Sequence, residues 1–219
     1  MRARAKLFLA SSNPGKLKEF RALAQTSTPG VADVLDARVE IELLPRFDSL
    51  PTFEEDAPTF AENAAGKALY YSRLGEGLVF ADDSGLVVPA LGGAPGVHSA
   101  RYAGPNATSA ERIVKLLSEL RGKEGDERAA YFVCAIALAE RGRAIAIVTA
   151  RVDGEILESR RGSGGFGYDP VFYFPALRKT FAELLPQEKN QISHRGKAFR
   201  RMVASVRDSD GHGIPCPCD

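Results

Sequence analysis

Two adjacent carboxylates, Asp82 and Asp83, follow residues 78–81, an apolar run with the length and composition of a buried strand. Charge at the end of a buried strand is costly unless a metal ion, a basic side chain or a substrate compensates it. The same residues with Ser84 and Gly85 could instead form a solvated turn, since Asp and Gly are common turn residues. These residues alone leave open both the choice between site and turn and the choice between the two carboxylates.

A second candidate is a predicted strand-to-helix turn near the N-terminus. Residues 6–11 form an apolar run, after which Asn13 and Pro14 suit an N-cap and a first helical position. Free N–H groups and the positive end of the helix dipole attract anions there, and Lys16 adds a charge. The P-loop pattern Gly-x-x-x-x-Gly-Lys-Ser/Thr is absent. The turn is a candidate phosphate site, although a plain connection would have the same pattern.

A third candidate is the acidic run at residues 54–56, Glu-Glu-Asp, which precedes an alanine-rich helix predicted from Thr59. The run could simply favour the N-terminus of that helix, or one of its carboxylates could bind a metal. Asn63 and Lys67 lie one turn apart and share a face of the helix.

Two further groups lie in the C-terminal third. Residues 162–167 match Gly-x-Gly-x-x-Gly, but proline and aromatic residues follow where a dinucleotide fingerprint requires a helix. The remaining glycine-rich loop presents Phe166 and Asp169, and Phe166 is either a platform for a flat ligand or a core residue. His194 and Arg195 begin the last predicted helix, where they are either ligand donors or part of a solvated basic face.

The length of the chain suits one large domain or two small lobes. Apolar runs at residues 130–139 and 144–152 predict a hairpin in a central sheet, followed by a turn at Asp153-Gly154. Strands are also expected at residues 6–11, 39–44 and 78–81, and helices at residues 14–24, 59–71 and 109–120 and after Ser193.

Charge and cysteine content narrow the class of protein. Lys plus Arg is 29 and Asp plus Glu is 28, so no overall basic field favours nucleic acid or a membrane surface. No segment approaches the roughly 20 apolar residues of a membrane helix, and a reducing cytoplasm is expected. Cys134 is expected in the core, whereas Cys216 and Cys218 lack further ligands for zinc, so residues 209–219 are predicted to be a disordered tail after a domain spanning residues 1–208.

Carboxylates for a divalent metal, lysines for phosphates and an aromatic residue with donors for a base together favour nucleotide handling with Mg²⁺. Seven motifs over about residues 6–206 then resemble the inosine triphosphatase family of non-canonical purine NTP pyrophosphatases. They are Ser11-x-Asn13-x-Gly-Lys16, Phe60-x-Glu-Asn-Ala-x-x-Lys67, Ala81-Asp-Asp-Ser-Gly-Leu86, Gly92-Gly-Ala-Pro-Gly96, Ser99-Ala-Arg-Tyr102, Gly165-Phe-Gly-Tyr-Asp-Pro170 and Ile192-Ser-His-Arg-Gly196.

This resemblance implies a homodimeric α/β enzyme with a long central mixed sheet, flanking helices and an active site in a cleft between two lobes. It implies Mg²⁺-dependent hydrolysis of ITP, dITP and XTP to the monophosphate and pyrophosphate, which cleanses the nucleotide pool. Asp83 would be the general base, and Glu54 with Asp83 would hold the metal, although Glu55 or Asp56 could replace Glu54. The residues implied to bind substrate are Ser11, Ser12, Asn13, Pro14, Gly15, Lys16, Lys67, Ser84, Phe166, Gly167, Tyr168, Asp169, Lys189, His194 and Arg195.

Because consecutive side chains of an extended strand point to opposite faces, only one of Asp82 and Asp83 can face the cleft. The family pattern assigns that place to Asp83, and Asp82 is then expected to brace the turn by accepting backbone N–H bonds. Two other functions fit the residues: a nucleotide hydrolase of different specificity, and a non-catalytic nucleotide-binding module.

Overall fold

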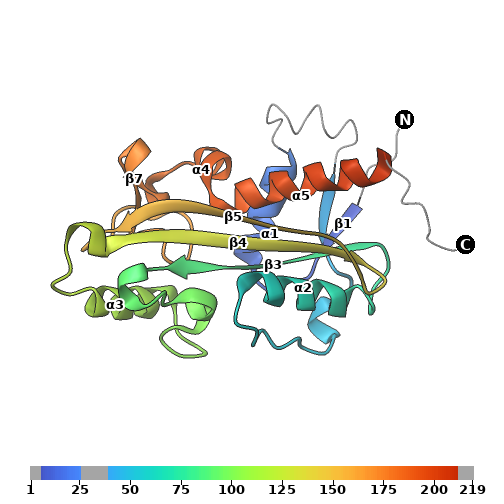
Figure 1. Cartoon of the computed structure of the whole chain (residues 1–219), viewed down its shortest axis with the longest axis horizontal. Helices are drawn as coiled ribbons and strands as arrows, with labels where there is room; N and C mark the ends of the chain where they lie inside the picture. The colour runs from blue at the N-terminus through green and yellow to red at the C-terminus, as the bar shows by residue number, and fades with distance from the viewer. Residues whose placement is uncertain (1–5, 26–38, 212–219) are drawn as a thin grey trace, which may run out of the picture.

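A computed structural model of the chain describes residues 6–25 and 39–211 (Figure 1). The strands are β1 (Lys6–Leu9), β2 (Glu40–Leu43), β3 (Leu78–Val87), β4 (Ala129–Glu140), β5 (Arg143–Ile156), β6 (Phe172–Phe174) and β7 (Lys179–Thr180). The helices are α1 (Pro14–Gln25), α2 (Phe60–Tyr71), α3 (Ser109–Glu119), α4 (Pro186–Ile192) and α5 (His194–Gly211). Every helix and strand expected from the apolar patterns is present, so the α/β prediction is confirmed.

The strands form one mixed seven-stranded sheet in the order β2-β1-β3-β4-β5-β6-β7. β1 is parallel to β2 and β3, whereas β3 to β7 pair antiparallel. The predicted hairpin is β4 with β5, but the turn expected at Asp153-Gly154 is wrong. β5 continues through both residues because they pair with Tyr131 and Ala130 of β4.

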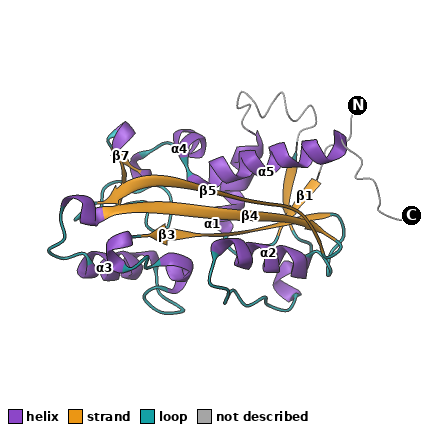
Figure 2. Ribbon diagram, viewed as in Figure 1, coloured by secondary structure: helices purple, strands orange, loops and turns teal. Residues whose placement is uncertain are grey.

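Helices cover both faces of the sheet (Figures 1 and 2): α1, α4 and α5 lie on one side, and α2 and α3 on the other. Alternate residues of β4 serve the two layers. Cys134, Ile136 and Leu138 pack in the cluster that includes α1 and α5. Ala135 and Ala137 pack in the cluster that includes α2. Cys134 is buried and free, as expected for a core cysteine.

The two ends of the described chain bear on two further expectations. Helix α5 continues to Gly211, three residues into the segment predicted to be a tail, and residues 212–219 with Cys216 and Cys218 lie outside the described residues. Within the described residues, no helix combines the length and apolarity needed to cross a membrane.

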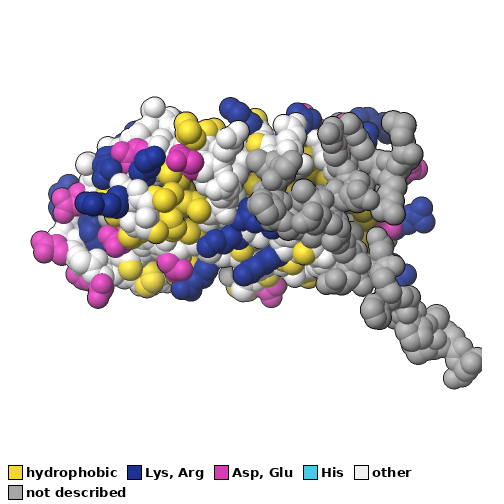
Figure 3. All heavy atoms as spheres, turned by 90° about the horizontal axis from the view of Figure 1, so that it is seen from above, with side chains coloured by type: hydrophobic (Ala, Val, Ile, Leu, Met, Phe, Trp, Pro, Cys, Tyr) yellow, Lys and Arg dark blue, Asp and Glu magenta, His cyan; other side chains and the backbone are white. Residues whose placement is uncertain are grey.

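The distribution of charge on the outer surface bears on where an anionic ligand could bind. On the face carrying α4 and α5, basic and acidic side chains are interspersed with apolar ones wherever the surface is not grey (Figure 3). Because charges of both signs are mixed on this face, we expect the basic side chains that bind an anionic ligand to line a cavity.

Candidate active site

A cavity of about 300 Å³ lies where β1 and β3 meet the start of α1, the glycine-rich loop and the start of α5. It brings together nearly all the residues implied by the family resemblance, although they come from distant parts of the sequence. Those that line it are Ser11, Ser12, Asn13, Lys16, Lys67, Asp83, Ser84, Phe166, Gly167, Tyr168, Asp169, Lys189, His194 and Arg195.

Three of the implied residues do not line the cavity: Pro14, Gly15 and Glu54. Pro14 and Gly15 stand in the first turn of α1. A Cβ atom on Gly15 would lie 3.2 Å from the ring of Phe166 and 3.1 Å from Oδ1 of Asn13. Glycine therefore lets the aromatic ring of the glycine-rich loop approach the helix closely.

Asp83 lies within β3, which runs through the carboxylate pair instead of ending before it. The solvated turn considered from the sequence is therefore wrong, because residues 79–87 pair continuously with β4. Asn63 of α2 donates a hydrogen bond of 3.0 Å to Oδ2 of Asp83. Burial, together with the nearby negative charge of Glu55, raises the pKa of Asp83 to about 6. A carboxylate with that pKa is suited to general-base catalysis near neutral pH.

Asp82 points to the opposite face of β3, as the extended backbone requires. It does not brace a turn through backbone N–H groups, and that expectation is wrong. Its carboxylate forms ion pairs with Nζ of Lys16 at 3.1 Å and with Nη2 of Arg195 at 3.5 Å. Burial opposes ionisation of Asp82, but the charges of Lys16, Arg195 and Lys67 outweigh it and hold the pKa below its usual value. Asp82 therefore anchors the cations of the site.

The start of α1 is capped as predicted, with a consequence for anion binding. Oδ1 of Asn13 accepts hydrogen bonds from the backbone N–H groups of Gly15 at 2.9 Å and Lys16 at 3.3 Å. These two N–H groups are consequently not free, contrary to the expectation from the sequence. The donors that line the cavity on this side include the hydroxyls of Ser11 and Ser12, the side-chain NH2 group of Asn13 and the ammonium group of Lys16.

The acidic run contributes Glu55, not Glu54, to the cavity. Glu54 is exposed and points away, whereas Glu55 is half-buried and lines the cavity. Glu55 forms an ion pair with Lys67 of α2. The sequence left open whether Glu54, Glu55 or Asp56 serves the site, and in the structure Glu55 lines the cavity.

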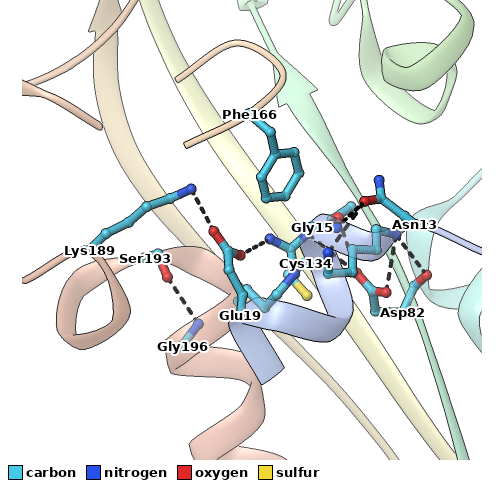
Figure 4. A network of polar contacts seen from close by, with 12 residues as sticks. Asn13, Gly15, Glu19, Asp82, Cys134, Phe166, Lys189, Ser193 and Gly196 are labelled. Carbon is cyan, nitrogen blue, oxygen red and sulfur yellow. Dashed lines mark hydrogen bonds and ion pairs between the residues drawn. The ribbon is translucent and has the colours of Figure 1, made fainter. Parts of the chain in front are cut away.

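At the other end of the cavity, Glu19 of α1 joins two cations of the C-terminal region (Figure 4). Its carboxylate forms ion pairs with Nζ of Lys189 at 2.7 Å and with Nη1 of Arg195. Lys189 also pairs with Asp169 at 2.6 Å, and Asp169 accepts the backbone N–H of Phe166 at 2.8 Å. The network fixes the glycine-rich loop to α1 and α4. Sequence reasoning missed Glu19, although its spacing of three from Lys16 places both on one helix face.

Aromatic groups and unpaired donors complete this end. The ring of Phe166 lies over the network (Figure 4), 4.9 Å from Nζ of Lys189. His194 stacks on Phe132 with ring centroids 4.7 Å apart. Burial, with the charges of Arg195 and Lys189, lowers the pKa of His194 well below its usual value, so the imidazole is neutral. His194 Nδ1 and Arg195 Nε are buried without a hydrogen-bond partner among the described residues, a pattern that calls for a functional explanation.

The carboxylates of the cavity fit a magnesium ion whose remaining ligands come from water and the substrate. Among the described residues no three His, Cys, Asp or Glu side chains converge as a complete metal site. Mg²⁺ is usually held by one or two carboxylates with the remaining positions taken by water and substrate phosphates. The like charges of Asp83 and Glu55, which raise the pKa of Asp83, are a pair that such a cation would stabilise.

Comparisons with known proteins bear on the family and the fold of the chain. The model of the Ham1 family matches residues 7–205. A dITP/XTP pyrophosphatase from Geobacillus kaustophilus is 51% identical over 196 residues, which are 90% of this chain and 91% of that protein. One from Coxiella burnetii is 44% identical over 206 residues, 93% and 97% of the two chains.

Solved structures give the same result. A HAM1 protein from Coxiella burnetii superposes with a TM-score of 0.79 at 41% identity and covers 94% of this chain and all 100% of its own. The Ham1 protein of Staphylococcus aureus has a TM-score of 0.77 at 36% identity, covering 93% and 98%. The family resemblance inferred from the motifs is confirmed, and this chain belongs to the Ham1 family.

Proposed function

We propose that this chain hydrolyses non-canonical purine nucleoside triphosphates, namely ITP, dITP and XTP, to the monophosphate and pyrophosphate. The relatives named dITP/XTP pyrophosphatase support the substrate class. The observation that carries the proposal is the position of Asp83, a carboxylate with a pKa of about 6 in a cavity lined by basic and aromatic side chains.

In this proposal Asp83 accepts a proton from the water that attacks the α-phosphorus, and pyrophosphate leaves. Asn63 holds one oxygen of Asp83, which leaves the other to the water. Lys16 and Lys67, both lining the cavity, neutralise triphosphate charge as it shifts toward the leaving group. Asp83 and Glu55 would hold Mg²⁺, which when bound neutralises phosphate charge and lowers the pKa of water.

The opposite end of the cavity suits a 6-keto purine. Arg195 donates a 2.8 Å hydrogen bond to the hydroxyl of Ser84 and also pairs with Glu19, so its guanidinium is held in one orientation. A fixed donor is satisfied by the 6-keto oxygen of hypoxanthine or xanthine. Adenine presents an amino group at that position and leaves the donor unpaired, which is a large penalty in a buried site. Phe166 offers a face on which the base can stack.

The test is a substrate panel of ITP, dITP, XTP, GTP, ATP and dUTP with Mg²⁺, with the released phosphate species identified. We expect pyrophosphate and the nucleoside monophosphate from the first three, with ATP and dUTP turned over far more slowly. Equal rates on ATP and ITP, or orthophosphate as the product, would exclude the proposal. Omission of Mg²⁺ with added EDTA should abolish turnover.

The pKa of Asp83 predicts the pH dependence. A general base must be deprotonated, so kcat/KM for ITP should increase as pH rises through about 6 and level off above it. Bound Mg²⁺ stabilises the carboxylate and should move this limb to lower pH, so the profile is measured at several Mg²⁺ concentrations. A profile that is flat from pH 5 to pH 8 at low Mg²⁺ would contradict the role of Asp83.

A homodimer, implied by the family resemblance, and a cytoplasmic location, expected from the cysteine content, complete the proposal. Sedimentation of the purified full chain tests the first. Fractionation of cells that express it tests the second.

A further inference from the structure

Two arginines line the same cavity without an assigned role: Arg101 and Arg112. The other cations of the cavity are paired with carboxylates: Lys16 with Asp82, Lys67 with Glu55, and Lys189 and Arg195 with Glu19. No described carboxylate forms an ion pair with either of the two arginines. Their positive charge is therefore uncompensated where an anionic ligand would lie.

The contacts of the two arginines hold them in place without neutralising them. Nη2 of Arg101 donates to the backbone carbonyl of Glu55 at 2.9 Å. Arg112 of α3 donates through Nη1 to the carbonyl of Ala100 and through Nη2 to the hydroxyl of Ser109 at 2.9 Å. Nε of Arg112 is buried without a partner among the described residues. An arginine carries five N–H donors, so most of those on Arg101 are unused.

The segment that carries Arg101 is rigidly placed beside Asp83. The 3-10 helix η3 (Gly96–Arg101) packs on β3, where Oγ of Ser99 accepts the N–H of Leu86 at 2.9 Å. A Cβ atom on Gly85 would lie 2.4 Å from that hydroxyl and 2.6 Å from the carbonyl of Gly96, so the close approach requires glycine. Tyr168 donates to the carbonyl of Ser99 at 3.0 Å, which ties η3 to the glycine-rich loop.

We propose that Arg101 binds the β- and γ-phosphates of the substrate, the part that leaves as pyrophosphate, and that Arg112 is a positioning residue that holds η3 beneath it. Arg101 lies beside Glu55, which pairs with Lys67 and faces Asp83, and so at the phosphate end of the cavity. Guanidinium groups bind phosphate oxygens in pairs and stabilise charge on a leaving phosphate. The identity of the anion rests on the proposed function.

The test measures binding of inorganic pyrophosphate and of IMP by calorimetry, with and without Mg²⁺, so no turnover is needed. Arg101→Gln should weaken pyrophosphate binding about 10- to 100-fold, the effect of losing a charged hydrogen bond. Binding of IMP should change by less than about twofold, because its contacts lie at the other end. Arg101→Lys keeps the charge without the paired donors, so its affinity for pyrophosphate should lie between those of the wild type and Arg101→Gln. Arg143→Gln is the matched control, an exposed arginine outside the cavity.

The possible outcomes separate the roles. A loss seen equally in EDTA and in Mg²⁺ supports direct contact with phosphate. A loss seen only with Mg²⁺ would overturn it, because Arg101 would then act by holding the segment of Glu55. Equal losses for pyrophosphate and IMP would also overturn it as a general structural effect. If wild-type protein binds pyrophosphate through Arg101 but does not hydrolyse ITP, the proposed function fails while this assignment stands.

Discussion

Asp83→Asn should abolish turnover and at the same time make the protein more stable. Asparagine cannot accept the proton of the attacking water, so kcat should fall by about 10³-fold or more. Asn63 can still hydrogen bond to the new side chain in place of the carboxylate, so the packing around it is kept. The folded state, however, no longer has to bury a negative charge beside Glu55.

The size and pH dependence of the stability gain follow from linkage. The pKa of Asp83 is raised in the folded state from 3.8 to about 6, so between these values the folded protein binds the proton more tightly than the unfolded chain. Wild-type stability therefore falls as pH rises through this window, and the amide escapes the loss. At pH 7 the variant should be about 1–3 kcal/mol more stable, with no difference below about pH 4.

Urea unfolding of both proteins from pH 4 to pH 8, without metal or nucleotide, measures this difference. Asp153→Asn is the control, an exposed carboxylate of β5 whose ion pair among the described residues is with Arg151. An amide variant that is less stable than wild type at pH 7 would show that Asp83 is stabilised by partners the cavity lacks in this structure. Near-normal turnover would remove Asp83 as the base.

Arg195→Met should produce the second large effect, on both stability and base selectivity. Arg195 is buried and pairs with the buried Asp82 and the partly buried Glu19, so its loss leaves both carboxylates undercompensated. Breaking a buried pair in this way costs about 3–5 kcal/mol. The lost donor to the base should lower kcat/KM for ITP about 100-fold while changing that for ATP much less.

The diagnostic quantity is the ratio of kcat/KM for ITP to that for ATP, because damage to the site as a whole would lower both. Arg195→Lys is the second variant. It keeps the charge near Glu19 and Asp82, so it should fold, but it loses the planar donor set and should still lower the ratio. Arg200→Met, on the same helix and hydrogen bonded, within the part of the chain that the structure describes, to the backbone carbonyls of Asn190 and Gln191, is the control. An unchanged ratio in both Arg195 variants would exclude a role in base recognition.

Local patterns in the sequence were enough to predict the elements and much of the site. The Asn13 cap, the α2 face with Asn63 and Lys67, and the alternation that separates Asp82 from Asp83 all follow from helix and strand periods. The family motifs then grouped residues that the fold does bring together in one cavity. What these signals share is that each depends on a few neighbouring residues.

The errors concern groups whose partners lie far along the chain. Asp82 was assigned backbone partners because Lys16 and Arg195, 66 and 113 residues away, cannot be foreseen from local spacing. Glu19 was not singled out from the sequence, because its partners Lys189 and Arg195 are 170 and 176 residues away. The choice between Glu54 and Glu55 depends on the path of an irregular segment, which has no period to predict it. Local patterns therefore failed to predict long-range charge pairing, and they also misplaced where two strands end, since β3 continues past Ala81 and β5 through Asp153-Gly154.

The opposite orientations of Asp82 and Asp83 also limit how this protein can be redesigned. Side chains along β3 alternate between the two faces of the sheet, so Asp82 lies on the side of α1 and α5 and Asp83 lies on the side of α2. One residue inserted ahead of the pair would put Asp82 in the place of Asp83, beside Asn63, whereas one residue deleted there would put Asp83 in the place of Asp82, among the cations. Because β3 pairs with β4 from Val79 to Val87, such a change cannot be absorbed by a local bulge without breaking that alignment. Changes of substrate range are better made in the loop that carries Phe166 and in η3, because the lengths of these segments do not decide which face of β3 each carboxylate occupies.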